Sequence, residues 1–164
     1  QWDVIMVDAY QDITIPFQMS SVEFFTEVYE HLKPGGAMVV NLSMRSESEG
    51  SMNEYLMDTI KSVFPYAWTV RVSSGTNMEL FATADADALA RFEERRGDVP
   101  DEYAAITQRV DDGLEAVEGG DYILTDDRAP VELLGMRVLD EIIAGELEVL
   151  RGQMAENGIM SLLQ

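Results

Sequence analysis

Short apolar runs and amphipathic stretches alternate along the first part of the chain. Residues 2–7 form a β-branched apolar run broken only by Asp3, and residues 37–42 form a second apolar run. Between the runs, apolar residues recur at the three- and four-residue spacing of one helix face: Val22, Phe25, Val28, Tyr29 and Leu32. This order predicts strand, helix and strand, joined as a right-handed crossover, with the first strand buried on both faces of a parallel sheet.

Local signals give the limits of the predicted helices. Ser20 and Glu23 have the spacing of a capping box, and residues 33–36 (Lys-Pro-Gly-Gly) end that first helix. A second helix is predicted from about residue 52 to residue 64, where Pro65 ends it. The later predicted elements are strands at 67–72 and 78–83 joined by a tight reversal, and helices at 88–96, 103–117 and 131–154.

The pattern indicates the second half of a parallel α/β nucleotide-binding-type domain. Such a domain normally has a strand followed by a glycine-rich turn and a helix N-terminus, and no Gly-x-Gly-x-x-Gly occurs in this sequence. Gly35 and Gly36 follow a predicted helix and precede a strand, which is the wrong order for that turn. We therefore expect the adenosine-binding half to be absent from this chain, and the chain alone to be an incomplete enzyme.

Composition narrows the classes of partner. The net charge of −20 argues against nucleic acid, because phosphate binding needs clustered Lys and Arg. A negative field attracts cations such as polyamines or metal ions, although general solubility explains the same charge. The sequence has no cysteine, which excludes thiolate chemistry and fits a reducing, cytoplasmic setting. It also has no long apolar stretch, so we expect no membrane contact by this chain.

Asp8 is the first candidate site residue. It follows the predicted strand at 2–7, and ligands of open parallel sheets bind outside the carboxyl ends of the strands. A carboxylate there can hold a cationic amine, or accept the proton of the amine as the amine becomes a nucleophile. The alternative is an aspartate that binds backbone amides in the turn after a strand.

Asp126 and Asp127 form a second candidate. Adjacent acids can line an amine site, but two carboxylates without further oxygen ligands are weak evidence for a metal, and we expect none. Their alternative role is to begin the last helix, with Pro130 in its first turn and Arg128 paired with one acid. His31 is the only histidine and is expected to complement a helix C-terminus.

Two blocks of this sequence resemble spermidine synthase and its relatives. The first is residues 2–10, with Ile15-Pro16 and the Ser-Val-Glu-Phe-Phe of residues 21–25 after it. The second is Leu-Thr-Asp-Asp-Arg-Ala-Pro-Val-Glu at residues 124–132. The His-Leu-Lys-Pro-Gly-Gly of residues 31–36 is similar too, but it is common to many methyltransferase-fold proteins. The likeness covers about residues 1–135.

This resemblance implies a fold and a reaction. The fold is a partial class I methyltransferase-like (Rossmann-type), mostly parallel sheet with flanking helices. Residues 1–135 would be the C-terminal half of the α/β domain, and residues 136–164 a helical extension. The family moves an aminopropyl group from decarboxylated S-adenosylmethionine to putrescine, and Asp8 matches its acidic residue after the fourth strand.

The match to the family's acceptor motif is incomplete. The family carries Asp-Ser-Ser/Thr-Asp-Pro after this strand, whereas residues 8–12 read Asp-Ala-Tyr-Gln-Asp. Asp12 is therefore a candidate for the second carboxylate of the putrescine site. Tyr10 is a candidate for packing against an adenine or an amine, with a core or turn position as the alternative.

Three interpretations of function remain open at this point. The chain is an aminopropyltransferase-like piece that is active only with its missing half, a non-catalytic dimerisation or interaction domain, or a methyltransferase of unknown substrate. The strand Trp2–Val7 would be a bare apolar edge. Since such an edge templates pairing with another chain, we expect a homodimer in which two copies pair through it.

Overall fold

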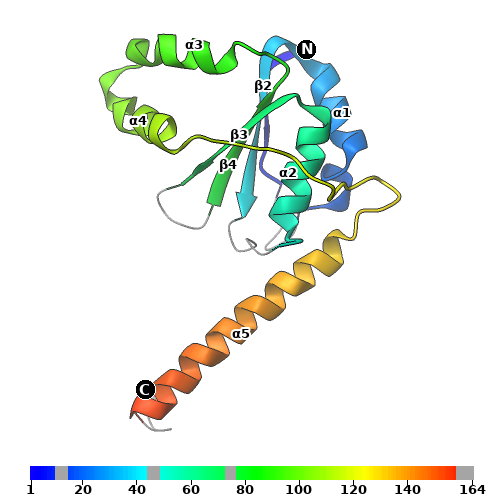
Figure 1. Ribbon diagram of the computed structural model, residues 1–164, viewed down its shortest axis with the longest axis vertical. Coiled ribbons are helices and arrows are strands. Elements are labelled where there is room, and N and C mark those ends of the chain that lie inside the picture. Colours follow the sequence, from blue (N-terminus) through cyan, green and yellow to red (C-terminus); the bar gives the residue numbers. More distant parts are fainter. Residues whose placement is uncertain (10–14, 44–48, 73–76, 158–164) are drawn as a thin grey trace.

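The computed structural model describes residues 1–9, 15–43, 49–72 and 77–157 of the chain (Figure 1). Within these ranges, five strands form one sheet in the order β1-β2-β4-β3-β5, with helices beside it. The strands are β1 (Trp2–Val7), β2 (Leu32–Ser43), β3 (Tyr66–Arg71), β4 (Asn77–Thr83) and β5 (Glu115–Ala116). The α-helices are α1 (Val22–His31), α2 (Met52–Val63), α3 (Ala88–Arg95), α4 (Ala104–Gly113) and α5 (Val131–Asn157). Three short 3-10 helices are η1 (Phe17–Met19), η2 (Arg96–Asp98) and η3 (Asp101–Tyr103).

The predicted α/β fold class is confirmed, but the sheet is not mostly parallel when neighbouring strands are compared. Only β1 and β2 pair in parallel, while β4 is antiparallel to both β2 and β3, and β5 is antiparallel to β3. The cause is the predicted reversal between β3 and β4, which inserts β4 between β2 and β3. It follows that β1, β2 and β3 all run in one direction and that β4 and β5 run in the other.

The hydrophobic core lies on the face of the sheet that α1 and α2 cover. Side chains alternate along β2, so Met38, Val40 and Leu42 have no exposed surface, whereas Val39 and Asn41 on the opposite face are half-buried. The helices contribute core residues at helical spacing: Phe25, Val28, Leu56 and Ile60. This single core holds the strand ends, and hence the candidate site, in fixed register.

The other face of the sheet is covered unevenly. Gly113 of α4 lies against Val70 of β3, so this end of the face is protected. At the opposite edge, Trp2, Val4 and Met6 of β1 are 64, 56 and 74% exposed. The expectation that β1 is buried on both faces is therefore wrong, because in the described ranges helices pack on only one of its faces.

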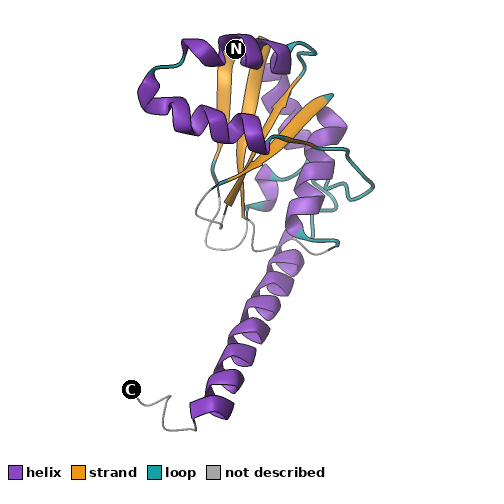
Figure 2. Cartoon of the chain, turned by 60° about the vertical axis from the view of Figure 1, so that its left-hand side comes forward, coloured by secondary structure: helices purple, strands orange, loops and turns teal. Residues whose placement is uncertain are grey.

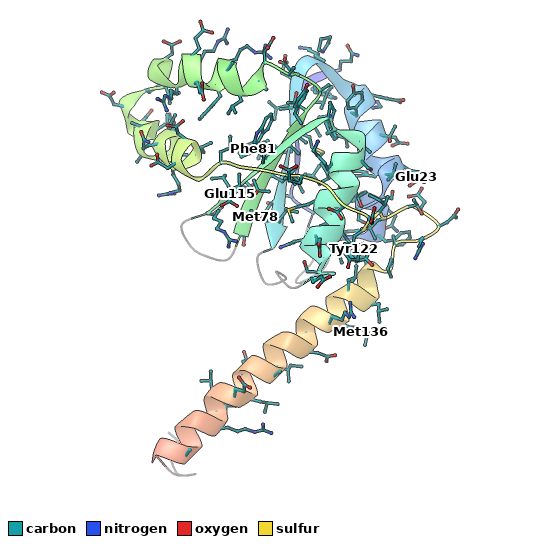
Figure 3. All side chains as sticks on the ribbon, in the orientation of Figure 1. Glu23, Met78, Phe81, Glu115, Tyr122 and Met136 are labelled. Atoms are coloured by element: carbon teal, nitrogen blue, oxygen red, sulfur yellow. The ribbon has the colours of Figure 1, made fainter. Side chains whose placement is uncertain are left out.

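The start of α1 differs from the predicted capping box by one residue. Ser21, not Ser20, is the N-cap, and its side chain accepts a hydrogen bond from the amide of Phe24. Ser20 instead donates to the Phe17 carbonyl. Glu23 does not reach back within the helix, since its carboxylate accepts from the backbone amide of Asp126, on the segment before α5 (Figure 3).

Two further predicted boundaries change because distant segments pair. The helix expected at 103–117 ends at Gly113, and β5 then pairs with β3. Residues 33–36 end the first helix as expected, but they lie within β2, where the register with β1 shifts. A Cβ on Gly36 would lie 3.0 Å from the Asp3 carbonyl oxygen, so only glycine fits this close approach of two backbones.

Helix α5 extends far from the body of the molecule as a single rod (Figures 1 and 2). Val131 and Leu134 are buried at its base, whereas Met136 is 65% exposed and points away from the body (Figure 3). No helix within the described ranges combines the length and the apolarity that a bilayer crossing requires. The division at residues 135 and 136 into a domain and an extension stays a prediction.

Candidate functional site

Asp8 lies directly after β1, at the carboxyl end of the strand, and is exposed. Its Oδ1 accepts a hydrogen bond of 3.0 Å from Nδ2 of Asn41 on the neighbouring strand. The parallel register brings the two residues together, because Val7 pairs with Val40 and the next residue of each strand follows. The side chain of Asp8 is thus held at one oxygen by a neutral amide.

The side chain of Asn41 is held in turn by a residue of β4, the strand on the other side of β2 from β1. Nδ2 of Asn77, at the start of β4, donates to Oδ1 of Asn41 over 2.9 Å. Since β4 is antiparallel to β2, its first residue lies at the same end of the sheet as the last residues of β1 and β2. Three strands therefore contribute one hydrogen-bonded chain of side chains, from Asn77 through Asn41 to Asp8.

Glu79 completes this polar row. It pairs with Asn41 in the β2–β4 register and lies on the same face of the sheet as Asn41. Burial raises the pKa of the Glu79 carboxyl, and the negative charge of Asp8 raises it further. Asp8 and Glu79 carry like charges on either side of the Asn41 amide. A cation bound near them would lower the electrostatic energy of this repulsion.

Tyr10 and Asp12, the two other candidates from the segment after β1, lie outside the described residues. Their assignment as substrate-binding residues stays a prediction. Asn77 and Glu79 were not predicted as site residues, because nothing local distinguishes them from other polar residues of an alternating strand. Asn41 lies within the predicted strand at residues 37–42 and was not predicted as a site residue either. The signal that unites them is the register between β2 and β4.

Asp126 and Asp127 lie in the turn that Thr125 and Arg128 close by mutual backbone hydrogen bonds. Asp126 Oδ1 accepts a 2.5 Å hydrogen bond from the hydroxyl of Ser21, the residue that caps α1. Asp127 is exposed. The described contacts of Asp126 tie this turn to α1 and do not join it to the row that contains Asp8.

A second polar region lies on the α2 side of the sheet. A cavity of about 850 Å³ opens between α2 and residues 115–122, and its lining includes Asp58 and Tyr122. The amide of Tyr122 donates to Asp58 over 3.0 Å, and the Tyr122 ring packs on that of Tyr55 at 4.8 Å. Burial, with the charges of Glu54 and Asp121, raises the pKa of the Asp58 carboxyl. Within the described ranges, no three metal-ligating side chains gather where they could hold an ion.

The described residues do not fit a nucleoside donor such as decarboxylated S-adenosylmethionine. A nucleoside cradle in this class of sheet needs a glycine-rich turn that leads from a strand end into a helix N-terminus. Gly35 and Gly36 lie inside β2, and the space beside Gly36 is filled by the backbone of Trp2 and Asp3. No chemical step that uses the donor is therefore assigned to these residues.

Comparison with known proteins gives one strong similarity. The whole chain aligns with a probable polyamine aminopropyl transferase of Bifidobacterium longum (strain NCC 2705), at 46% identity over 186 residues. The chain spans 41% of the length of that relative. No family model matches the sequence.

Three solved structures have weaker similarity. A probable spermidine synthase from Corynebacterium glutamicum has a TM-score of 0.48 and 20% identity, over 70% of this chain and 42% of its own. Human methyltransferase-like protein 13 has a TM-score of 0.47 and 21% identity, over 68% and 47% of the two chains. Spermidine synthase from Thermotoga maritima has a TM-score of 0.46 and 16% identity, over 79% and 40%. Since the sequence match takes in the whole chain, the resemblance to the spermidine synthase and polyamine aminopropyltransferase-like family is confirmed.

Proposed function

We propose that this chain carries the amine-acceptor side of an aminopropyl-transfer site, with Asp8 as the carboxylate that meets the amine. The observation that carries the proposal is the position of Asp8, exposed at the carboxyl end of β1 and held by Asn41. The 46% identity with a probable polyamine aminopropyl transferase supports the reaction class. The acceptor is a putrescine-type diamine, and the setting is the cytoplasm.

The chemistry requires a base beside the amine. A protonated amine must lose its proton before it attacks carbon, and a positioned carboxylate can bind the ammonium and then accept that proton. Asp8 offers Oδ2 for this purpose, since Oδ1 is bonded to Asn41. Binding also fixes the amine in one position and orientation. This supplies a further part of the rate enhancement, because the loss of translational and rotational entropy then takes place before the reaction step.

The donor, decarboxylated S-adenosylmethionine, has no fitting place among the described residues. We therefore propose that transfer takes place in an intact parent protein, and that this chain by itself binds the amine but does not catalyse.

A thermal-shift titration tests the proposal. Putrescine at about 100 times its dissociation constant should stabilise the fold by about 2.7 kcal/mol. For a domain of this size, that is a rise in Tm of about 5–10 °C. Methylthioadenosine and decarboxylated S-adenosylmethionine should produce no shift.

Two variants separate Asp8 from general charge. Asp8→Asn should remove the shift at the putrescine concentration used for the unaltered chain, and should leave only weak binding that higher concentrations detect. The matched control Asp140→Asn removes the same charge from an exposed position on α5 and should keep the shift. A putrescine shift that both variants keep would show that the amine binds the acidic surface at large, and the proposal would fail.

A second candidate function is association through β1. The specific observation is the edge position of β1, with the exposed apolar side chains of Trp2, Val4 and Met6 beside it. We propose that two copies pair through this edge into one continuous sheet. Light scattering after size exclusion should give a dimer for the chain and a monomer for Val4→Lys. The control Leu139→Lys places the same charge on exposed α5 and should stay dimeric, and a monomeric unaltered chain contradicts the proposal.

A further inference from the structure

The hydrogen-bonded chain from Asn77 to Asp8 has a direction. Nδ2 of Asn77 donates to Oδ1 of Asn41, and Nδ2 of Asn41 donates to Oδ1 of Asp8. An amide nitrogen can only donate, and an ionised carboxylate can only accept. Because Asn77 donates to the Asn41 side-chain oxygen, the Asn41 side-chain nitrogen points the other way, where it needs an acceptor.

Two carboxylates lie beside Asn41 on this face of the sheet. Asn41 lies in one row between Asp8 on β1 and Glu79 on β4, with its backbone paired to Glu79. Neighbouring strands are about 4.8 Å apart, so the Asn41 side chain can turn toward either carboxylate. Asn77, two residues before Glu79 on the same face, occupies the Asn41 carbonyl and leaves the nitrogen directed at Asp8.

We infer that Asn41 and Asn77 are positioning residues, which hold the Asp8 carboxylate in one orientation with Oδ1 committed and Oδ2 presented to the amine. The inference deepens the proposed function and rests on it. In the described contacts Asn77 hydrogen-bonds Asn41, and Asn41 hydrogen-bonds Asp8, so Asn77 acts on Asp8 through Asn41. Without Asn77, the Asn41 amide exchanges between Asp8 and Glu79, and the Asp8 side chain samples further rotamers.

The register explains why these residue types are needed at these places. Ser43 pairs with Asn77, and Asn41 pairs with Glu79, so Asn77 is a diagonal neighbour of Asn41 within reach of its side chain. A hydroxyl side chain at position 77 is too short for this reach. An acid there would offer an acceptor to the Asn41 amide and so reverse its direction.

A double-mutant cycle on putrescine binding tests the inference. Asn77→Leu removes the donor at similar volume and should weaken putrescine binding about five-fold, the size expected for the loss of one net hydrogen bond. In an Asp8→Asn background, Asn77→Leu should cause no further loss, because its effect passes through Asp8. Equal losses in both backgrounds would show a merely structural role and would overturn the inference. Asn77→Ala serves as the second variant if the leucine variant fails to fold.

A control lies on the same strand and face. Thr83, at the other end of β4, donates a buried hydrogen bond to the Gly36 carbonyl over 2.7 Å. Thr83→Val loses this bond far from Asp8 and should leave putrescine affinity unchanged. A five-fold loss from Thr83→Val would assign the Asn77 effect to general loosening of the strand.

The ligand-free protein gives an independent measurement. The side-chain amide signals of Asn41 in nitrogen–proton correlation spectra should shift strongly in both Asn77→Leu and Asp8→Asn. If those signals do not respond, the hydrogen-bonded chain is absent, and the inference fails whether or not putrescine binds. If they respond while the unaltered chain binds no putrescine, the chain of amides stands and the proposed function is overturned.

Discussion

Thr59 joins α2 to the segment that carries Asp126, and its removal is a sharp test of how that segment is held. The residue has no exposed surface. Its hydroxyl donates to the Tyr55 carbonyl over 2.6 Å and accepts from the backbone amide of Leu124 over 2.9 Å. Thr59→Val keeps the shape of the side chain and removes both hydrogen bonds.

The two losses differ in size. The Tyr55 carbonyl also accepts the ordinary i to i−4 bond inside α2, so losing the hydroxyl donor there costs little. Leu124 is fully buried, and its amide is left without the Thr59 acceptor. An unsatisfied buried donor costs about 1–3 kcal/mol, so we expect Thr59→Val to destabilise by about 2 kcal/mol.

Urea denaturation followed by circular dichroism, together with thermal melting, measures this effect. For a chain of this length, about 2 kcal/mol corresponds to a drop in Tm of about 4–8 °C. The matched control is Thr26→Val on α1, where the hydroxyl donates over 2.7 Å to the Val22 carbonyl of the same helix. That change orphans no buried amide and should cost less than about 0.5 kcal/mol.

The reasoning is refuted if the two valine variants lose the same stability. Equal values would mean that the Leu124 amide finds water or another acceptor at no cost. Thr59→Ser separates the methyl group from the hydroxyl, because it keeps both hydrogen bonds. It should lose only about 1 kcal/mol, the share of one buried methyl group.

Three further predictions concern the backbone, a buried acid and a helix cap. In urea titrations, Gly36→Ala should destabilise the fold by more than about 1 kcal/mol, since its Cβ would lie 3.0 Å from carbonyl oxygens. The control Gly145→Ala, whose Cβ would have no neighbour within 4 Å, should be neutral or stabilising. Asp58 has a pKa raised above 3.8 in the folded state, chiefly by burial, so the folded state holds this proton more tightly than the unfolded chain. The stability of the unaltered protein should therefore fall as pH rises above about 4, and Asp58→Asn should remove that part of the fall. Ser21→Ala loses the α1 cap and the bond to Asp126, and should cost about 1–2 kcal/mol in the same titration.

Local elements of this fold were predictable because their signals are local. The helix α2 was predicted at 52–64 and is found at Met52–Val63, since its apolar stripe and Pro65 fix both ends. The position of β4 between β2 and β3 depends on pairing between distant segments, which no local pattern records. The same holds for residues 114–117, where a helical periodicity gives way to the pairing of β5 with β3.

The candidate site divides in the same way. Asp8 was predicted because a polar residue ends an apolar strand, and strand ends are where ligands of such sheets bind. The roles of Asn77 and Glu79 depend on the antiparallel register of β4 against β2, which places them beside Asn41. Asp126 was predicted to line an amine site or to begin the following helix, but its carboxylate accepts a hydrogen bond from the cap residue of α1, more than one hundred residues earlier.

The shape of α5 implies that the chain does not unfold as one cooperative unit. The helix has 27 residues, or about 40 Å, and among the residues whose burial is described the buried ones, Val131, Leu134 and Gly135, lie at its start. Beyond them, amides from about residue 140 can open to solvent without disturbing the sheet. Their hydrogen exchange should proceed through local fraying, at rates insensitive to Thr59→Val, while the amides of β2 and β4 exchange only on global unfolding.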